Sequence, residues 1–387
     1  MQEKTLVLFE LLKAGLWELE VRLSQFERID FKGTFRLADE QSVVGLIAAG
    51  LEHVSGINPD QNVVLQFIGM AMQLEQRNIS MNSFIGVLVN KMRAEGIEAL
   101  LLKGQGIAQC YERPLWRTYG DVDFLLSEDD YEKAKAYLIP LASSVDPECV
   151  LSKHLGMTIN QWVVELHGTL RCTLSKKINK VLAEIHNSAS GNGNVRIWTN
   201  GKTEVHLLGV DSDAIYIFTH ILSHFYKGGI GLRQICDWCR LLWTYKESLN
   251  RSLLESRIQR MGLLSEWKAF GAFVVDYLGM PSEAMPLYSS DKKWSRKADK
   301  ICAFIMEVGN FGHNRDNSYY TKYPFLIRKI YSFGRRCGDL VHHARIFPLD
   351  SLKFFPYMMY NGLKAALSVE KTNMCRKCDG VGYLFRD

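Results

Sequence analysis

The sequence predicts an α+β protein, with a mixed sheet core at about residues 96–210 between helical regions at 1–95 and 211–387. Apolar residues recur at helical spacing in both flanking regions, whereas the core holds short apolar runs bounded by glycine and polar residues. The length of 387 residues suits two or three packed units. We therefore expect one strand-bearing core with helices before and after it.

The N-terminal region is expected to be helical. Apolar residues between Leu6 and Trp17 follow helical spacing, and residues 43–54 repeat the pattern. Residues 62–76 and 80–95 continue it as two further segments.

Two strands are expected early in the core. Residues 96–104, GIEALLLKG, form a short apolar run ending in glycine, which is typical of a buried strand before a tight turn. Residues 122–126, VDFLL, are a second such run. Between them, a short helix at 105–111 is expected to end before Pro114, because proline interrupts helical hydrogen bonding.

A helix and two more strands follow. Ser127 precedes three acidic residues, as is typical of a helix N-terminus, so residues 127–138 are predicted to be helical. The runs 157–161 and 162–170, MTINQ and WVVELHGTL, are predicted to pair as a hairpin.

Helical periodicity returns after the core, at 213–226 and 232–245 on either side of the turn KGGIG. The net charge of the whole chain is only +5, but from Lys322 onward twelve Lys and Arg stand against five Asp and Glu. This basic end suits nucleic acid, phosphate-rich substrates or an anionic surface, or it is simply a solvated helical face.

The composition favours a cytoplasmic protein. The N-terminal residues scatter charges among apolar positions and lack the basic start and cleavage site of a signal peptide. No run approaches the roughly eighteen uncharged apolar residues of a membrane-spanning helix. Nine cysteines, an odd number, then favour reduced thiols.

Asp121 and Asp123 are the first candidates for chemistry. Side chains two residues apart on a strand point to the same face, so both carboxylates are expected to project together. Two like charges held close repel, and a divalent cation such as Mg²⁺ relieves the repulsion through oxygen ligands. The alternative is a polar strand edge with two solvated acids.

Three further features change that balance. Glu165 lies on a strand that can pair beside residues 122–126 and bring a third carboxylate to a second metal ion. The Lys103-Gly104 turn lets backbone N–H groups approach phosphate oxygens. Arg117 can pair with the acids, grip a phosphate, or only hold its loop to the sheet.

In combination, these segments resemble a family of bacterial nucleotidyltransferase-like proteins within the DNA polymerase β superfamily. The family pattern is an apolar run ending in Lys-Gly, then R-x-x-G-D-[IV]-D-[LF]-L, then a later E-L-H strand. Over roughly residues 85–245 this chain matches the pattern in order, at Lys103-Gly104, Arg117, Gly120-Asp121-Val122-Asp123 and Glu165-Leu166-His167.

The resemblance implies a nucleotidyltransferase-like sheet, with Mg²⁺ or Mn²⁺ as cofactor. The implied catalytic and metal-binding carboxylates are Asp121, Asp123 and Glu165. The implied nucleotide-binding residues are Lys103, Gly104, Arg117 and Gly120. One departure concerns catalysis: many active superfamily members carry Gly-Ser at the turn, whereas Gln105 follows Gly104 here.

The expected reaction transfers a nucleoside monophosphate from an NTP, with ATP as the expected donor, to a hydroxyl acceptor. A sugar, another small molecule, a protein side chain or an RNA end all fit as acceptor. A catalytically weak or inactive nucleotide-binding protein with a regulatory or antitoxin-like role is the alternative, which Gln105 favours. Nucleic-acid binding through the basic C-terminal region is a third hypothesis.

Polar residues after the core form a second set that the same family tends to carry. His220 and His224 lie four apart and share a helix face. With His167, Arg233 and Asp237, they are interpreted either as substrate contacts or as a buried packing network.

Two cysteine pairs remain. Cys236 and Cys239 lie within a helical pattern and are expected in the core. Cys375 and Cys378 resemble half of a zinc-binding motif without an evident second half. Free thiols on an exposed turn, or oxidation of that pair to a disulfide, are the alternatives.

Overall fold

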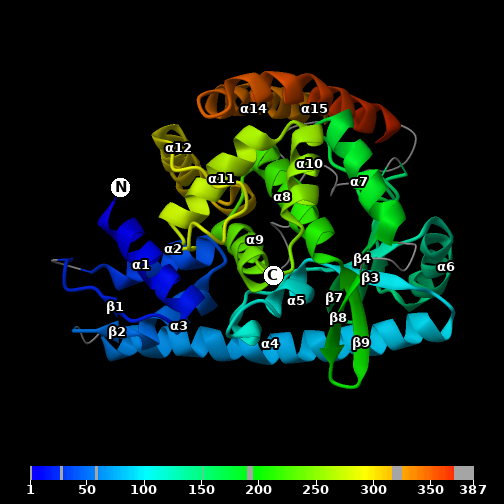
Figure 1. The fold of residues 1–387 in the computed structure, drawn as a ribbon. Helices are drawn as coiled ribbons and strands as arrows, with labels where there is room; N and C mark the ends of the chain where they lie inside the picture. Colours follow the sequence, from blue (N-terminus) through cyan, green and yellow to red (C-terminus); the bar gives the residue numbers. More distant parts are fainter. Residues whose placement is uncertain are drawn as a thin grey trace.

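The molecule contains a seven-stranded mixed sheet and a 34-residue helix that runs along one side (Figure 1). They are seen in a computed structural model that describes residues 2–26, 29–56, 60–150, 152–189, 195–315 and 325–369. Helices stand before and after the sheet in the chain, so the predicted α+β class is confirmed.

The elements take the following bounds in chain order. The α-helices before and within the sheet region are α1 (Glu3–Trp17), α2 (Phe31–Glu40), α3 (Val44–Glu52), α4 (Gln61–Ala94), α5 (Gly104–Ala108), α6 (Glu128–Leu138) and α7 (Lys176–Ala189). The later α-helices are α8 (Val210–Lys227), α9 (Leu232–Thr244), α10 (Arg251–Met261), α11 (Leu264–Asp276), α12 (Lys292–Val308), α14 (Phe325–Ala344) and α15 (Pro348–Val369). The strands are β1 (Val21–Arg22), β2 (Val54–Ser55), β3 (Ala99–Leu102), β4 (Val122–Leu126), β5 (Ser144–Val145), β6 (His154–Ile159), β7 (Trp162–His167), β8 (Val195–Asn200) and β9 (Thr203–Leu208).

The large sheet has the strand order β5-β6-β7-β4-β3-β9-β8. Its central strand β4 runs antiparallel to β3 and parallel to β7. The predicted hairpin is confirmed as β6 and β7, and its second strand lies directly beside β4, as expected for the strand that carries Glu165.

The two faces of the sheet differ in chemistry because side chains alternate along each strand. On β4, Val122, Phe124 and Leu126 belong to an apolar cluster that also contains residues of α4 and α6. Asp123 lies between them in the strand and therefore faces the opposite side. The same alternation on β7 buries Val164 and Leu166 in that cluster and turns Glu165 toward the side of Asp123.

Helices from both ends of the chain share the second apolar cluster. Phe9 of α1 packs edge-on against Phe273 of α11, with ring centroids 6.2 Å apart. Cys236 and Cys239 of α9 are fully buried in this cluster, which confirms their predicted place in the core.

Helix α4 is one continuous helix where two segments were expected. Between the two expected segments lies Asn78, whose polar side chain is buried and donates to the backbone oxygens of Leu115 and Arg117. The polar residues therefore serve a tertiary contact, and the helix continues along the side of the molecule from the N-terminal helices to the sheet (Figure 1).

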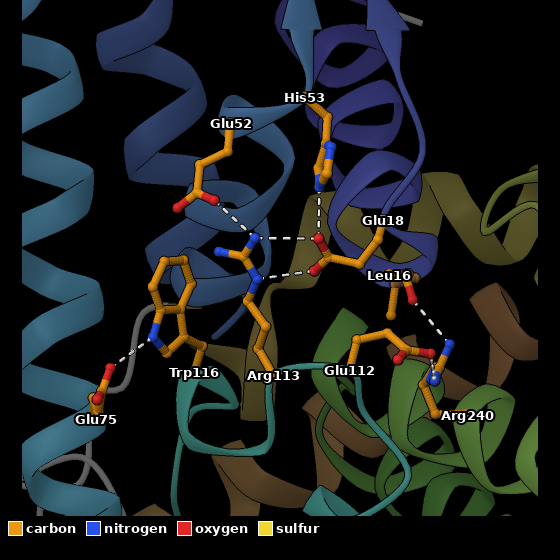
Figure 2. A network of polar contacts seen from close by, with 9 residues as sticks. All are labelled: Leu16, Glu18, Glu52, His53, Glu75, Glu112, Arg113, Trp116 and Arg240. Atoms are coloured by element: carbon orange, nitrogen blue, oxygen red, sulfur yellow. Dashed lines mark hydrogen bonds and ion pairs between the residues drawn. The ribbon is translucent and has the colours of Figure 1, made fainter.

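The loop that leads into β4 is fastened to the N-terminal helices (Figure 2). Arg113 donates to Glu18 at 2.9 Å and to Glu52 at 2.7 Å, and Trp116 Nε1 donates to Glu75 of α4 at 3.0 Å. From the other side, Arg240 of α9 donates to Glu112 of this loop at 2.9 Å and to the carbonyl of Leu16 of α1 at 2.9 Å. These contacts hold the residues that precede Asp121 in one position.

No helix among the described residues is long and apolar enough to cross a membrane. Cys375 and Cys378, the suggested zinc half-motif, lie outside the described residues, as do residues 322–324 and 370–387 of the basic C-terminal segment.

Candidate active site

Two adjacent strands bring Asp123 and Glu165 together. In the parallel pairing of β4 with β7, Asp123 lies directly opposite Glu165. Both side chains are buried, at 4% and 7% exposed. Because the two carboxylates share one face of neighbouring strands, they lie side by side at the centre of the sheet.

Two histidines meet these carboxylates. His167 Nε2 lies 2.9 Å from Asp123 Oδ1 and 3.8 Å from Glu165 Oε2. His154 Nε2 lies 3.0 Å from the same Glu165 oxygen. The side chains of His154 and His167 are 17% and 15% exposed, more than the two carboxylates.

The turn after β3 adds a cation. Lys103 and Gly104 both have positive φ angles, 52° and 45°, so the chain reverses sharply here before α5. The turn brings Lys103 Nζ to 3.2 Å from Asp123 Oδ1. Strain at a non-glycine residue with positive φ is found most often at functional positions.

The electrostatics keep both carboxylates charged. Burial alone would raise the pKa of Asp123, but the charge of Lys103 and the hydrogen bond with His167 outweigh it and hold that pKa well below its usual range. Burial would likewise raise the pKa of Glu165, and the hydrogen bond with His154 helps to lower it instead. The site is therefore a buried anionic pair, which is the electrostatic environment that a cation requires.

Asp121 lies one residue before β4 and is half-buried. The common direction expected for the Asp121 and Asp123 side chains stays a prediction, because Asp121 precedes the strand. Its charge acts on Arg233: burial and Arg117 lower the pKa of Arg233 to about 10, whereas Asp237 and Asp121 oppose that shift.

Arg117 and Asp237 form a buried ion pair. Nε and Nη2 of Arg117 donate to the two oxygens of Asp237, each at 2.7 Å, and Nη1 donates to the carbonyl of Thr118. Tyr111 donates to the same carboxylate at 2.8 Å. In this structure the guanidinium holds the loop before β4 to helix α9, whereas the structural role considered from the sequence was to hold that loop to the sheet.

Arg233 supports the next part of that loop. Its Nη1 donates to the carbonyl oxygens of Thr118 at 3.3 Å and Tyr119 at 2.8 Å. A side chain at Gly120 would approach the same guanidinium, with a Cβ 3.7 Å from Nη1. Arg233 Nε is buried and has no hydrogen-bond partner among the described residues, so it can still donate to a ligand.

Helix α8 presents a row of polar rings beside the site. His220 and His224 lie with ring centroids 4.4 Å apart, and Tyr216 is one turn away from His220. Burial and the charge of Lys103 lower the pKa of His220 well below its usual value, and burial with Lys227 lowers that of His224 to about 3. Both imidazoles are therefore neutral at physiological pH, which suits packing or hydrogen bonding.

His154 was missed in the sequence because the predicted strand began only at Met157. The strand β6 begins earlier, at His154, and this residue pairs directly with His167 across the hairpin. Counting the hairpin register back from its turn through Lys153-His154 would have placed a histidine opposite the E-L-H segment.

A family model described as "Uncharacterised nucleotidyltransferase" matches residues 27–278. The match covers well over half of the chain and contains every strand of the seven-stranded sheet. No curated protein and no solved structure matches the chain. The family match supports a role in nucleotidyl transfer, and the chain belongs to this uncharacterised nucleotidyltransferase family.

Proposed function

We propose that the chain is a divalent-metal-dependent enzyme that transfers a nucleoside monophosphate, with ATP as donor, to a hydroxyl acceptor. The observation that carries this is the pairing of Asp123 with Glu165 on adjacent strands, both charged and both buried, within a nucleotidyltransferase family.

The donor set fits a divalent cation. Both carboxylates offer oxygen ligands on one face of the sheet, and both approach the same His167 nitrogen. When bound there, the ion supplies neutralisation of the charge that develops on the phosphates as pyrophosphate leaves. Asp121 is the third proposed ligand, from the loop immediately before β4.

Other residues position the nucleotide. In this proposal the triphosphate lies at the Lys103-Gly104 turn, where glycine keeps the backbone accessible and Lys103 adds a positive charge. Gly120 keeps the opposite loop free of a side chain, and Arg233 Nε offers a further donor. Arg117 acts at one remove, by fixing that loop through Asp237.

A catalytically weak, nucleotide-binding regulatory protein is the second candidate function. It is favoured by Gln105, which stands where many active relatives carry serine. The Gln105 side chain is 3% exposed and donates to Asn78 at 3.1 Å and Asn82 at 2.7 Å. It is thus engaged with α4 and is not available to a phosphate.

Incubation with each α-labelled NTP and Mg²⁺ or Mn²⁺, together with pooled sugars, RNA and protein acceptors, tests the proposal. Pyrophosphate release with labelling of one acceptor class is the expected result. The matched control for Glu165→Gln is Glu204→Gln, an exposed glutamate of β9. Nucleotide binding without turnover in any mixture would favour the regulatory protein.

A further inference from the structure

Three side chains of the β6–β7 hairpin converge on one point. Among the described residues, His154, Glu165 and His167 form a group whose ligand atoms all lie within 4.8 Å of one another. Each imidazole presents Nε2 to the same oxygen, Glu165 Oε2, at 3.0 and 3.8 Å. Around a metal with ligand bonds of about 2.0–2.2 Å, neighbouring donor atoms have separations of this size.

The hairpin register produces the convergence. Glu165 and His167 are two residues apart on β7 and share a face, and His154 lies directly opposite His167 on β6. The residue opposite Glu165 is Gly156, so no side chain covers the carboxylate from that strand. The three candidate ligands thus lie on the two neighbouring strands of one hairpin.

We infer that His154, Glu165 and His167 bind a first-row transition ion such as Zn²⁺, in preference to Mg²⁺. Two imidazole nitrogens and one carboxylate oxygen are typical donors for such ions, whereas Mg²⁺ prefers oxygen throughout. Asp123 Oδ1, 2.9 Å from His167 Nε2, lies on the side where a substrate phosphate is proposed to enter. This inference rests on the proposed function in one respect, namely that Glu165 faces a divalent ion.

Metal titration of the full chain tests the inference without nucleotide. Chelator-treated protein, with Cys375→Ser and Cys378→Ser so that those thiols cannot bind metal, is titrated calorimetrically with Zn²⁺ and with Mg²⁺. One Zn²⁺ per chain is expected, bound at least about 100-fold more tightly than Mg²⁺. His154→Gln and His167→Gln should each weaken Zn²⁺ binding at least about tenfold. The matched control is His206→Gln on β9, outside the cluster, which should leave it unchanged.

The absorption spectrum of Co²⁺-loaded protein gives a second readout that needs no histidine variant. Visible bands of a nitrogen- and oxygen-ligated ion, without a thiolate charge-transfer band, are expected. Equal affinity for Zn²⁺ and Mg²⁺, Zn²⁺ binding that survives both histidine substitutions, or a Co²⁺ spectrum of an all-oxygen site would each overturn the inference. A full-length protein that binds Zn²⁺ as expected but shows no NTP turnover would count against the proposed function and not against this inference.

Discussion

Buried carboxylates are charged in one region of this protein and neutral in another. At the sheet centre, Asp123 and Glu165 have lowered pKa values because Lys103, His154 and His167 lie around them. In the C-terminal helices, burial and then the charge of Asp350 raise the pKa of Glu266 to about 8, and its contact is the Tyr226 hydroxyl at 3.1 Å. Burial by itself neutralises a carboxylate, so the charged pair at the sheet marks a place arranged for cations.

The largest expected effect is on catalysis. Asp123→Asn removes one charge of the pair and should lower nucleotidyl transfer at least about a thousandfold, because the metal's charge stabilisation is worth several kcal/mol. Initial rates at saturating NTP measure it, after circular dichroism has established that the variant is folded. Asp129→Asn, on the exposed first turn of α6, is the matched control. A variant that retains half of the wild-type rate would rule out a catalytic role for Asp123.

The Arg117–Asp237 pair should matter mainly for stability. Arg117→Ala leaves Asp237 buried without its cation and should lower the free energy of unfolding by about 3 kcal/mol or more, measured by urea denaturation. Arg117→Met combined with Asp237→Leu should recover much of that loss. If the stable double variant binds NTP at least tenfold more weakly than the wild type, then Arg117 contacts the nucleotide. Its role would then not be limited to holding the loop before β4 to α9.

Glu266 should give the protein a pH-dependent stability. Its folded-state pKa of about 8 lies above its ordinary value of 4.5, so the folded state keeps a proton that the unfolded chain releases between those values. The contribution of Glu266 to stability is therefore full below pH 4.5 and should fall by up to roughly 1 kcal/mol per pH unit as the pH rises toward 8. The pH dependence of the melting temperature across this range should become flatter in Glu266→Gln. It should not change in Glu283→Gln, a control at an exposed residue. A wild-type profile without this fall would contradict a protonated Glu266.

The smallest effect is expected at the loop contacts of Arg113. This side chain is 27% exposed, so Arg113→Met should cost only about 1 kcal/mol in unfolding free energy despite losing Glu18 and Glu52. Arg36→Met, at a largely exposed ion pair with Glu40, is the control and should change less. A loss of more than about 3 kcal/mol at Arg113 would mean that this loop is central to folding.

Local sequence patterns predicted the fold class and the strands that carry Asp123 and Glu165. The short apolar runs VDFLL and WVVELH identified both strands, and the structure pairs them with Asp123 opposite Glu165. The contacts made over long sequence separations could not be read in the same way. Nothing in the sequence indicated that Asn78 of α4 donates hydrogen bonds to Leu115 and Arg117, 37 and 39 residues further along the chain.

The functional residues divide along the same line. Motif spacing identified Lys103, Asp123 and Glu165. It could not distinguish Arg117 from residues that face a ligand, because Arg117 pairs with Asp237, 120 residues further along the chain. His154 was not identified from the sequence, because its position in the site depends on the register of a hairpin and not on a motif.

A crystal structure with Mn²⁺ and a non-hydrolysable ATP analogue tests the central claim most directly. We predict an anomalous peak within about 2.3 Å of oxygens of both Asp123 and Glu165, with the triphosphate at the Lys103-Gly104 turn. Ordered nucleotide and metal bound away from both carboxylates would contradict it.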